Sequence, residues 1–118
     1  ATHINQFTKR TREDLLFFDF LASHDGIGLL GAKGILKEEE VENLIRRTLA
    51  HKGMVSYQVK NGEKHPYELN ITYFDAINDP SKPDDPFVVR RFIASQAVML
   101  SLRGVPGIYI HSLLGSRN

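Results

Sequence analysis

The chain has 118 residues, a formal net charge of +1 at pH 7 and no cysteine, and its apolar and charged contents are close to globular averages. The near-zero charge gives no support to a nucleic-acid or acidic-membrane partner, and the lack of cysteine excludes a disulfide framework, a thiolate metal site and a cysteine nucleophile. No apolar run approaches the roughly 18–20 residues that span a bilayer, and the first residues do not resemble a signal peptide. We therefore expect a cytoplasmic protein, because cysteine-free chains suit a reducing compartment.

The first two predicted elements are a helix end and a strand. Residues 2–11 are polar apart from Ile4 and Phe7, whose spacing fits the last turns of a helix. Residues 15–22 are apolar on both alternating faces, which predicts a parallel strand that is covered on both sides. Asp19 interrupts this strand, and a buried carboxylate needs a partner.

Polar, titratable groups follow this strand at its C-terminal tip. His24 and Asp25 come directly before Gly26-Ile27-Gly28, where the glycines allow a sharp turn. In α/β proteins, and above all in (β/α)8 barrels, the chemistry is carried at this tip. His24 and Asp25 are therefore candidate site residues. The alternative for His24 is a structural histidine that is held by hydrogen bonds. The alternative for Asp25 is a turn aspartate, which is common before glycine.

Residues 26–34 are rich in glycine and predict a loop, and residues 38–52 predict an amphipathic helix. Three glutamates, Glu38, Glu39 and Glu40, begin this helix and favour the positive end of its dipole, and Gly53 is placed to cap its C-terminal end. We interpret the acidic run as a solvated first turn rather than a metal site.

A hairpin is predicted next. Residues 54–59 alternate like a strand, and Asn61-Gly62 is the strongest two-residue hairpin signal. Pro66 makes the return segment, residues 63–69, an edge strand or an irregular loop. One or two helical turns over residues 70–77 and a polar loop over residues 78–85 follow.

A second clear helix is predicted over residues 86–102, with Asp84 or Asp85 as its N-cap. Its apolar residues cover most of the circumference, which predicts burial on most sides. Residues 107–112 then read as another buried strand. A long helix between two apolar strands is a parallel crossover, so the chain is predicted to be α/β. The piece between the strands is too long for an ordinary connection, and we assign residues 29–85 to an inserted subdomain.

Three segments together resemble one family. They are residues 20–28 (FLASHDGIG), residues 66–74 (PYELNITYF), and residues 95–97 with 102–112 (SQA and LRGVPGIYIHS). They resemble the seventh strand, an acceptor-site loop, and the seventh helix with the eighth strand of the sucrose phosphorylase-like branch of the α-amylase superfamily. The family fold is a (β/α)8 TIM barrel, which needs ~250 residues. The resemblance implies that residues 1–118 are a fragment of that barrel, from strand seven to strand eight, with an inserted helix-hairpin subdomain.

The resemblance also implies a mechanism and site residues. It implies retaining double displacement on an α-glucoside, with the nucleophile and the acid/base carboxylates upstream of Ala1, so the chain alone is expected to be inactive. Asp25 would stabilise the transition state and His24 would contact a sugar hydroxyl. Tyr67 and Glu68 would border the acceptor and phosphate subsites. Glu68 replaces a glutamine that we associate with sucrose phosphorylases, which favours a small polyol acceptor, unless Glu68 simply faces solvent.

We accordingly predict a part of a glucoside phosphorylase that releases α-glucose 1-phosphate from sucrose, glucosylglycerol or glucosylglycerate, with phosphate as the second substrate. One alternative is an α-amylase-type hydrolase or transglycosylase. Another is an autonomous α/β interaction domain. No cofactor or metal is expected, because Asp19, Asp25 and Glu68 are too scattered to form a ligand set. Open sheet edges and apolar faces predict that the isolated fragment dimerises, aggregates or repacks.

The remaining histidines and tyrosines are interpreted structurally. We expect His65, beside Pro66, to be exposed, and Tyr73 and Tyr109 to pack. His111 lies at the end of the last predicted strand, at the functional face of a barrel, and we interpret it as a packing residue as well.

Overall fold

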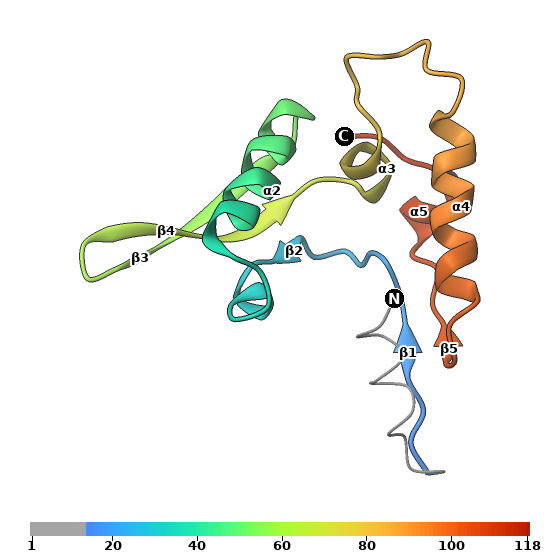
Figure 1. Ribbon diagram of the computed structural model, residues 1–118, viewed down its shortest axis with the longest axis horizontal. Coiled ribbons are helices and arrows are strands. Elements are labelled where there is room, and N and C mark those ends of the chain that lie inside the picture. Colours follow the sequence, from blue (N-terminus) through green and yellow to red (C-terminus); the bar gives the residue numbers. More distant parts are fainter. Residues whose placement is uncertain (1–13) are drawn as a thin grey trace.

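A computed structural model describes residues 14–118, so the helix predicted within residues 2–11 lies outside the described residues. Figure 1 shows a mixture of helices and strands. The elements in chain order are β1 (Phe18–Asp19), β2 (Ile27–Gly28), the 3-10 helix η1 (Leu30–Ala32), α2 (Glu38–Ala50), β3 (Met54–Lys60), β4 (Glu63–Asn70), α3 (Tyr73–Ile77), α4 (Val88–Leu100), β5 (Val105–Pro106) and α5 (Ile110–Leu114). Within residues 14–118, no helix has the length and apolar character needed to cross a membrane.

The strands form two separate sheets. β1 pairs in parallel with β5, and β4 lies between β2 and β3 in an antiparallel sheet. The β3–β4 hairpin extends away from α4, on the opposite side of the molecule in Figure 1, and α3 lies between these two parts.

The helix predicted over residues 38–52 is confirmed as α2, but its C-terminal end differs from the prediction. Lys52, not Gly53, adopts the left-handed conformation, with φ 65°. The Gly53 N–H donates to the Thr48 carbonyl at 2.9 Å and closes the helix end. A Cβ at Gly53 would lie 2.8 Å from Thr48 Cγ2 and 2.9 Å from the Asn70 carbonyl oxygen. Gly53 is therefore required for a close approach to the end of β4, rather than for its backbone angles.

The predicted hairpin is confirmed. Asn61 and Gly62 have φ values of 55° and 81°, as a type I′ turn requires. The register shifts once, because Glu68 lies opposite Ser56 and Pro66 lies opposite the next residue of β3, which leaves Tyr67 as an extra residue on β4. β4 is the middle strand, so the prediction of an edge strand is wrong. Pro66 is tolerated there because β2 pairs only with Glu68 and Leu69.

The first predicted strand, residues 15–22, is much shorter in the structure. Only Phe18–Asp19 pairs with Val105–Pro106, although the predicted parallel pairing across α4 is present. The predicted burial is wrong, since Leu16 is 82% exposed and Phe18 is 65% exposed. A parallel strand normally has neighbours on both edges and cover on both faces. Within residues 14–118, β1 has one neighbour.

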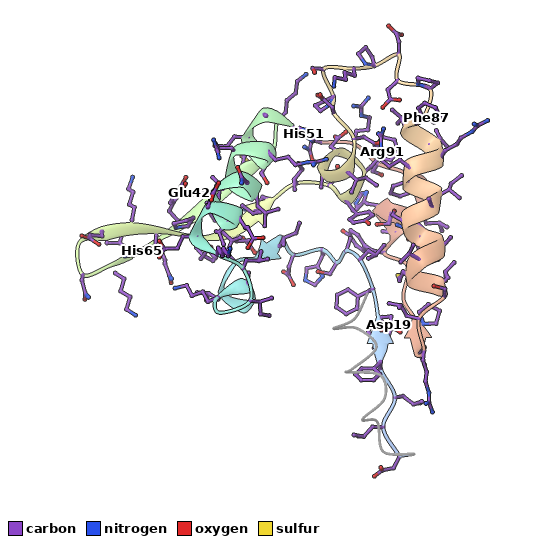
Figure 2. The ribbon with its side chains drawn as sticks, viewed as in Figure 1. Asp19, Glu42, His51, His65, Phe87 and Arg91 are labelled. Carbon is purple, nitrogen blue, oxygen red and sulfur yellow. The ribbon has the colours of Figure 1, made fainter. Side chains whose placement is uncertain are left out.

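Asp19 lies in β1 beside the chain that enters β5 (Figure 2). Its carboxylate sits directly over Gly104, where a Cβ would overlap a carboxylate oxygen and would lie 2.8 Å from the Phe17 carbonyl oxygen. The Val105 N–H donates to that Phe17 carbonyl at 2.8 Å. Gly104 therefore permits the close approach of the two strands, in addition to following the end of α4.

The strand predicted over residues 107–112 is wrong. Ile110–Leu114 forms the short helix α5, which Gly115 ends in the left-handed conformation with φ 62°. A short apolar run fits a strand and a buried helix turn equally well, and the glycine after it is a helix-ending signal.

The second predicted helix is confirmed as α4. Asp85 does not cap it directly; its carboxylate accepts from the Phe87 N–H at 2.9 Å and from Arg91 at 2.8 Å. These two hydrogen bonds, that from Arg91 first, hold the pKa of the Asp85 carboxyl below its usual range. Figure 2 shows Arg91 reaching from α4 toward the polar loop before it.

The predicted burial of α4 on most sides is wrong. Phe92 is buried against the rings of Tyr73 and Phe74, at centroid distances of 6.0 and 5.1 Å. The other faces carry exposed apolar side chains, namely Val89, Ile93, Val98 and Leu100. Among residues 14–118, the buried apolar side chains are Leu29, Leu69, Phe92 and Met99. Most apolar surface of β1 and α4 therefore has no cover from the described residues.

Candidate functional site

A cavity of about 460 Å³ lies where three segments of the chain meet. Its wall is made by the turn after β1 (residues 20–27), by the segment from the end of β4 into α3 (residues 70–74), and by residues around α5. The predicted residues His24 and Asp25 both line it. The turn at the tip of β1 therefore opens on this cavity.

His24 and Asp25 form an open pair in this cavity. His24 Nε2 lies 3.4 Å from Asp25 Oδ1, and the two side chains are 81% and 70% exposed. The Asp25 N–H donates to Ser23 Oγ at 3.2 Å, which fixes the turn beneath the carboxylate. An exposed ion pair contributes little to stability, so the exposed carboxylate and imidazole are available to hydrogen-bond a ligand.

Gly26 places this turn against β4. A Cβ at Gly26 would lie 2.6 Å from Glu68 Cγ and 2.7 Å from the Leu69 carbonyl oxygen, whereas a Cβ at Gly28 would meet nothing within 4 Å. A backbone oxygen cannot move aside as the end of a side chain can. The first glycine is therefore required by the packing of the turn on β4, and the second is not.

The structure places Tyr67 and Glu68 near this turn but outside the cavity wall. Glu68 is half-buried against Gly26, one residue from Asp25, and it pairs with Gly28 across β2 and β4. Tyr67 is the extra residue of the β4 irregularity, and its carbonyl accepts from the Leu29 N–H at 2.8 Å. Their predicted role at the acceptor site stays a prediction.

Sequence reasoning missed the part that His111 plays in this cavity. His111 is exposed and lines the cavity rather than packing into a core. Its Nδ1 lies 3.0 Å from Ser116 Oγ, and its ring meets the Tyr109 ring edge-on at 5.3 Å. The signal was its position after the second parallel strand, where barrels carry functional residues.

Sequence reasoning also missed a buried carboxylate behind the cavity. Asp75 in α3 is 3% exposed, and its two carboxylate oxygens accept from Arg117 Nε at 3.0 Å and from the Asn118 N–H at 2.7 Å. His51, at the end of α2, donates from Nδ1 to the Asp75 carbonyl at 2.6 Å, and Figure 2 shows its ring directed at α3. Asp75 therefore links the end of α2 to residues 117 and 118, and Asn118 lines the cavity.

Across residues 14–118, no group of three or more histidine and acidic side chains is arranged to hold a metal ion. The cavity wall instead combines a carboxylate, two imidazoles, and the hydroxyl or amide groups of Ser23, Asn70, Thr72, Ser112, Ser116 and Asn118. Such a set of donors and acceptors suits a ligand with several hydroxyl groups.

No protein-family model matches the chain. The chain is 54% identical over 102 residues to the glucosylglycerate phosphorylase of Spirochaeta thermophila. This match covers 86% of this chain and 17% of that protein. It is 47% identical over 105 residues to the glucosylglycerate phosphorylase of Allomeiothermus silvanus, covering 88% and 19%. It is 28% identical over 112 residues to the sucrose phosphorylase of Bifidobacterium adolescentis, covering 83% and 20%.

Among solved structures, the sucrose 6F-phosphate phosphorylase from Thermoanaerobacter thermosaccharolyticum resembles the whole chain. The TM-score is 0.71 at 20% identity, and the match covers 100% of this chain and 22% of that chain. The fold of this chain is therefore that of one part of the sucrose 6F-phosphate phosphorylase. The chain spans about a fifth of the length of the curated relatives it matches.

Proposed function

We propose that this chain, which is related in sequence to the sucrose phosphorylase-like branch of the α-amylase superfamily, is part of a retaining α-glucoside phosphorylase that releases α-glucose 1-phosphate. The observation that carries the proposal is the identity to glucosylglycerate phosphorylases over most of the chain. That identity is well above the identity to sucrose phosphorylase, so glucosylglycerate is the favoured glucoside.

In this proposal, β1 and β5 are two adjacent parallel strands of a (β/α)8 barrel, its seventh and eighth, and residues 29–85 form an insertion between them. Their parallel pairing across α4 supports this placement. The exposed apolar faces of β1 and α4 also support it, since these are the faces that neighbouring barrel segments would cover.

The proposed reaction is a double displacement. A carboxylate nucleophile attacks the anomeric carbon while a carboxylic acid protonates the departing oxygen, and a phosphate oxygen then displaces the enzyme carboxylate. These two carboxyl groups would come from segments outside residues 1–118. Asp25 would face the positive charge that develops at the sugar ring, and His24 would hold a neighbouring hydroxyl.

Burial has to increase for Asp25 to act in this way. A carboxylate stabilises developing positive charge most strongly when water is excluded. The Asp25 side chain is 70% exposed among the described residues, so further segments and the sugar itself would cover it. Glu68, half-buried against Gly26 of the same turn, would border the acceptor together with Tyr67.

The test is an assay of the complete protein with α-glucosylglycerate, with and without inorganic phosphate. We expect glucose 1-phosphate only when phosphate is present. Release of free glucose at a rate independent of phosphate would contradict phosphorolysis and would support the hydrolase alternative. The absence of any glucoside conversion, with cooperative monomeric unfolding of the 118-residue chain, would support an autonomous interaction domain. A cytoplasmic location and dimerisation of the isolated chain stay predictions.

A further inference from the structure

His111 is held from one side by a residue five positions further along the chain. The Ser116 N–H donates to the His111 carbonyl at 2.8 Å, and Ser116 Oγ lies 3.0 Å from His111 Nδ1. Gly115, with φ 62°, reverses the chain after α5 and makes this return possible. The same residue thus fixes both the backbone and the ring of His111.

The two residues that follow Ser116 are bonded to a buried carboxylate, which holds Ser116 in place. Arg117, the next residue, donates to the buried Asp75 carboxylate at 3.0 Å, and the Asn118 N–H donates to the same carboxylate at 2.7 Å. Tyr109 packs edge-on against the imidazole at 5.3 Å. Because Nδ1 is taken by Ser116, Nε2 is the ring nitrogen that remains, and no protein group within residues 14–118 hydrogen-bonds it.

The charge of the described cavity wall also distinguishes His111. Residues 20–118 contribute no lysine or arginine to this wall, so its two histidines are the side chains that can carry positive charge. His24 Nε2 already lies 3.4 Å from Asp25. His111 has no carboxylate at ion-pair distance among residues 14–118, so its Nε2 is available to a ligand.

We propose that His111 is an oxyanion-binding residue of this cavity, with Nε2 donating to an oxygen of phosphate or of the acceptor carboxylate. This inference rests on the proposed function. In that reaction the departing group and the incoming phosphate bond in turn to the same carbon, so they occupy one region of the site. For a glucosylglycerate phosphorylase both groups are anions, and one held imidazole can serve both.

The test compares His111→Phe, His111→Gln and the control His65→Phe in the complete protein. His65 is a partly exposed histidine on the hairpin, far from α5 in Figure 2. We measure KM for inorganic phosphate in phosphorolysis, and KM for glycerate and for uncharged glycerol in the reverse reaction from glucose 1-phosphate.

We expect His111→Phe to raise KM for at least one oxyanion about tenfold or more, because a hydrogen bond to a charged group is lost. KM for glycerol and kcat should change much less, and His111→Gln, which retains an amide donor, should recover part of the loss. A rise for phosphate alone or for glycerate alone supports the proposal and identifies the anion. Equal KM values in wild type, His65→Phe and His111→Phe would overturn it.

A second readout separates this inference from the proposed function. The histidine NMR signals of the complete protein are followed during titration with inorganic phosphate and, separately, with glycerate. The His111 signal is assigned by its absence from the spectrum of the His111→Phe variant. A shift of the His111 signal supports the inference even if the wild-type protein proves to be a hydrolase. No shift with either anion, in an enzyme that does perform phosphorolysis, overturns the inference and leaves the proposed function intact.

Discussion

The hairpin part of this chain (β2, α2, β3 and β4) and its parallel part (β1, α4 and β5) differ in how much of their own packing they provide. In the hairpin part, β4 is paired on both edges near Leu69, whose side chain is 2% exposed. In the parallel part, β1 and β5 pair over two residues each, and Leu16 is 82% exposed. The cavity with His24, Asp25 and His111 lies where these parts meet. Structure from both parts thus positions the site, and the described residues leave His24 and Asp25 exposed.

The largest effect is expected at the cavity. Asp25→Asn in the complete protein should lower kcat about 10²–10³-fold, about 3–4 kcal/mol of transition-state stabilisation, because a preorganised charge next to the reacting carbon is lost. Steady-state kinetics with α-glucosylglycerate and phosphate measure this. Asp84→Asn, an exposed carboxylate in the polar loop before α4, is the matched control and should retain wild-type activity. Near-wild-type turnover of Asp25→Asn would show that Asp25 is not the stabilising residue.

The next effect is expected at the connection between the two parts. Asp75→Ala should destabilise the complete protein by about 3 kcal/mol, since it leaves Arg117 and the Asn118 N–H without their buried acceptor. Denaturant unfolding gives the change in free energy. Asp79→Ala removes a loop carboxylate that bonds only nearby residues in the described structure, and should cost much less. An equal loss in both variants would contradict the anchoring role of Asp75.

A smaller effect should appear where the turn packs on β4. Gly26→Ala should cost about 2 kcal/mol, because its Cβ would press on the Leu69 carbonyl and on Glu68. Gly28→Ala has free space around it and should be close to neutral. Unfolding free energies and kcat/KM are measured for both. If the two variants behave alike, the packing of the turn on β4 does not set the position of Asp25.

The smallest effect is expected in the hairpin turn. Gly62→Ala should cost about 1 kcal/mol because Gly62 has φ 81°, a conformation that disfavours a side chain. Gly31→Ala, with neither a positive φ nor a nearby atom, is the matched control. Unfolding of the complete protein measures both, and kcat should stay unchanged, since the turn lies away from the cavity. A loss of activity without a loss of stability would contradict this separation of the two parts.

The same difference explains what could be predicted from the sequence. The hairpin, α2 and α4 were predicted correctly, because Asn61-Gly62 and the helical spacing of apolar residues act over short distances. Residues 15–22 and 107–112 were not, because the extent of a parallel strand depends on distant partners, and the signal for α5 was a single glycine after an apolar run. His24 and Asp25 were found from their place after β1, and the cavity contains both. Asp75 was missed because its partners, Arg117 and Asn118, are far from it in the chain. The exposure of His111 was missed because the cavity forms where three distant segments meet.

The measurement that tests the central claim most directly compares the purified 118-residue chain with the complete protein. Both are supplied with phosphate and with sucrose, glucosylglycerol or glucosylglycerate, and glucose 1-phosphate is measured. We predict release by the complete protein, fastest with glucosylglycerate, and none by the 118-residue chain. Release by the chain alone would place the catalytic carboxylates within residues 1–118. Failure of the complete protein to release glucose 1-phosphate from any of these glucosides would contradict the assignment as a phosphorylase.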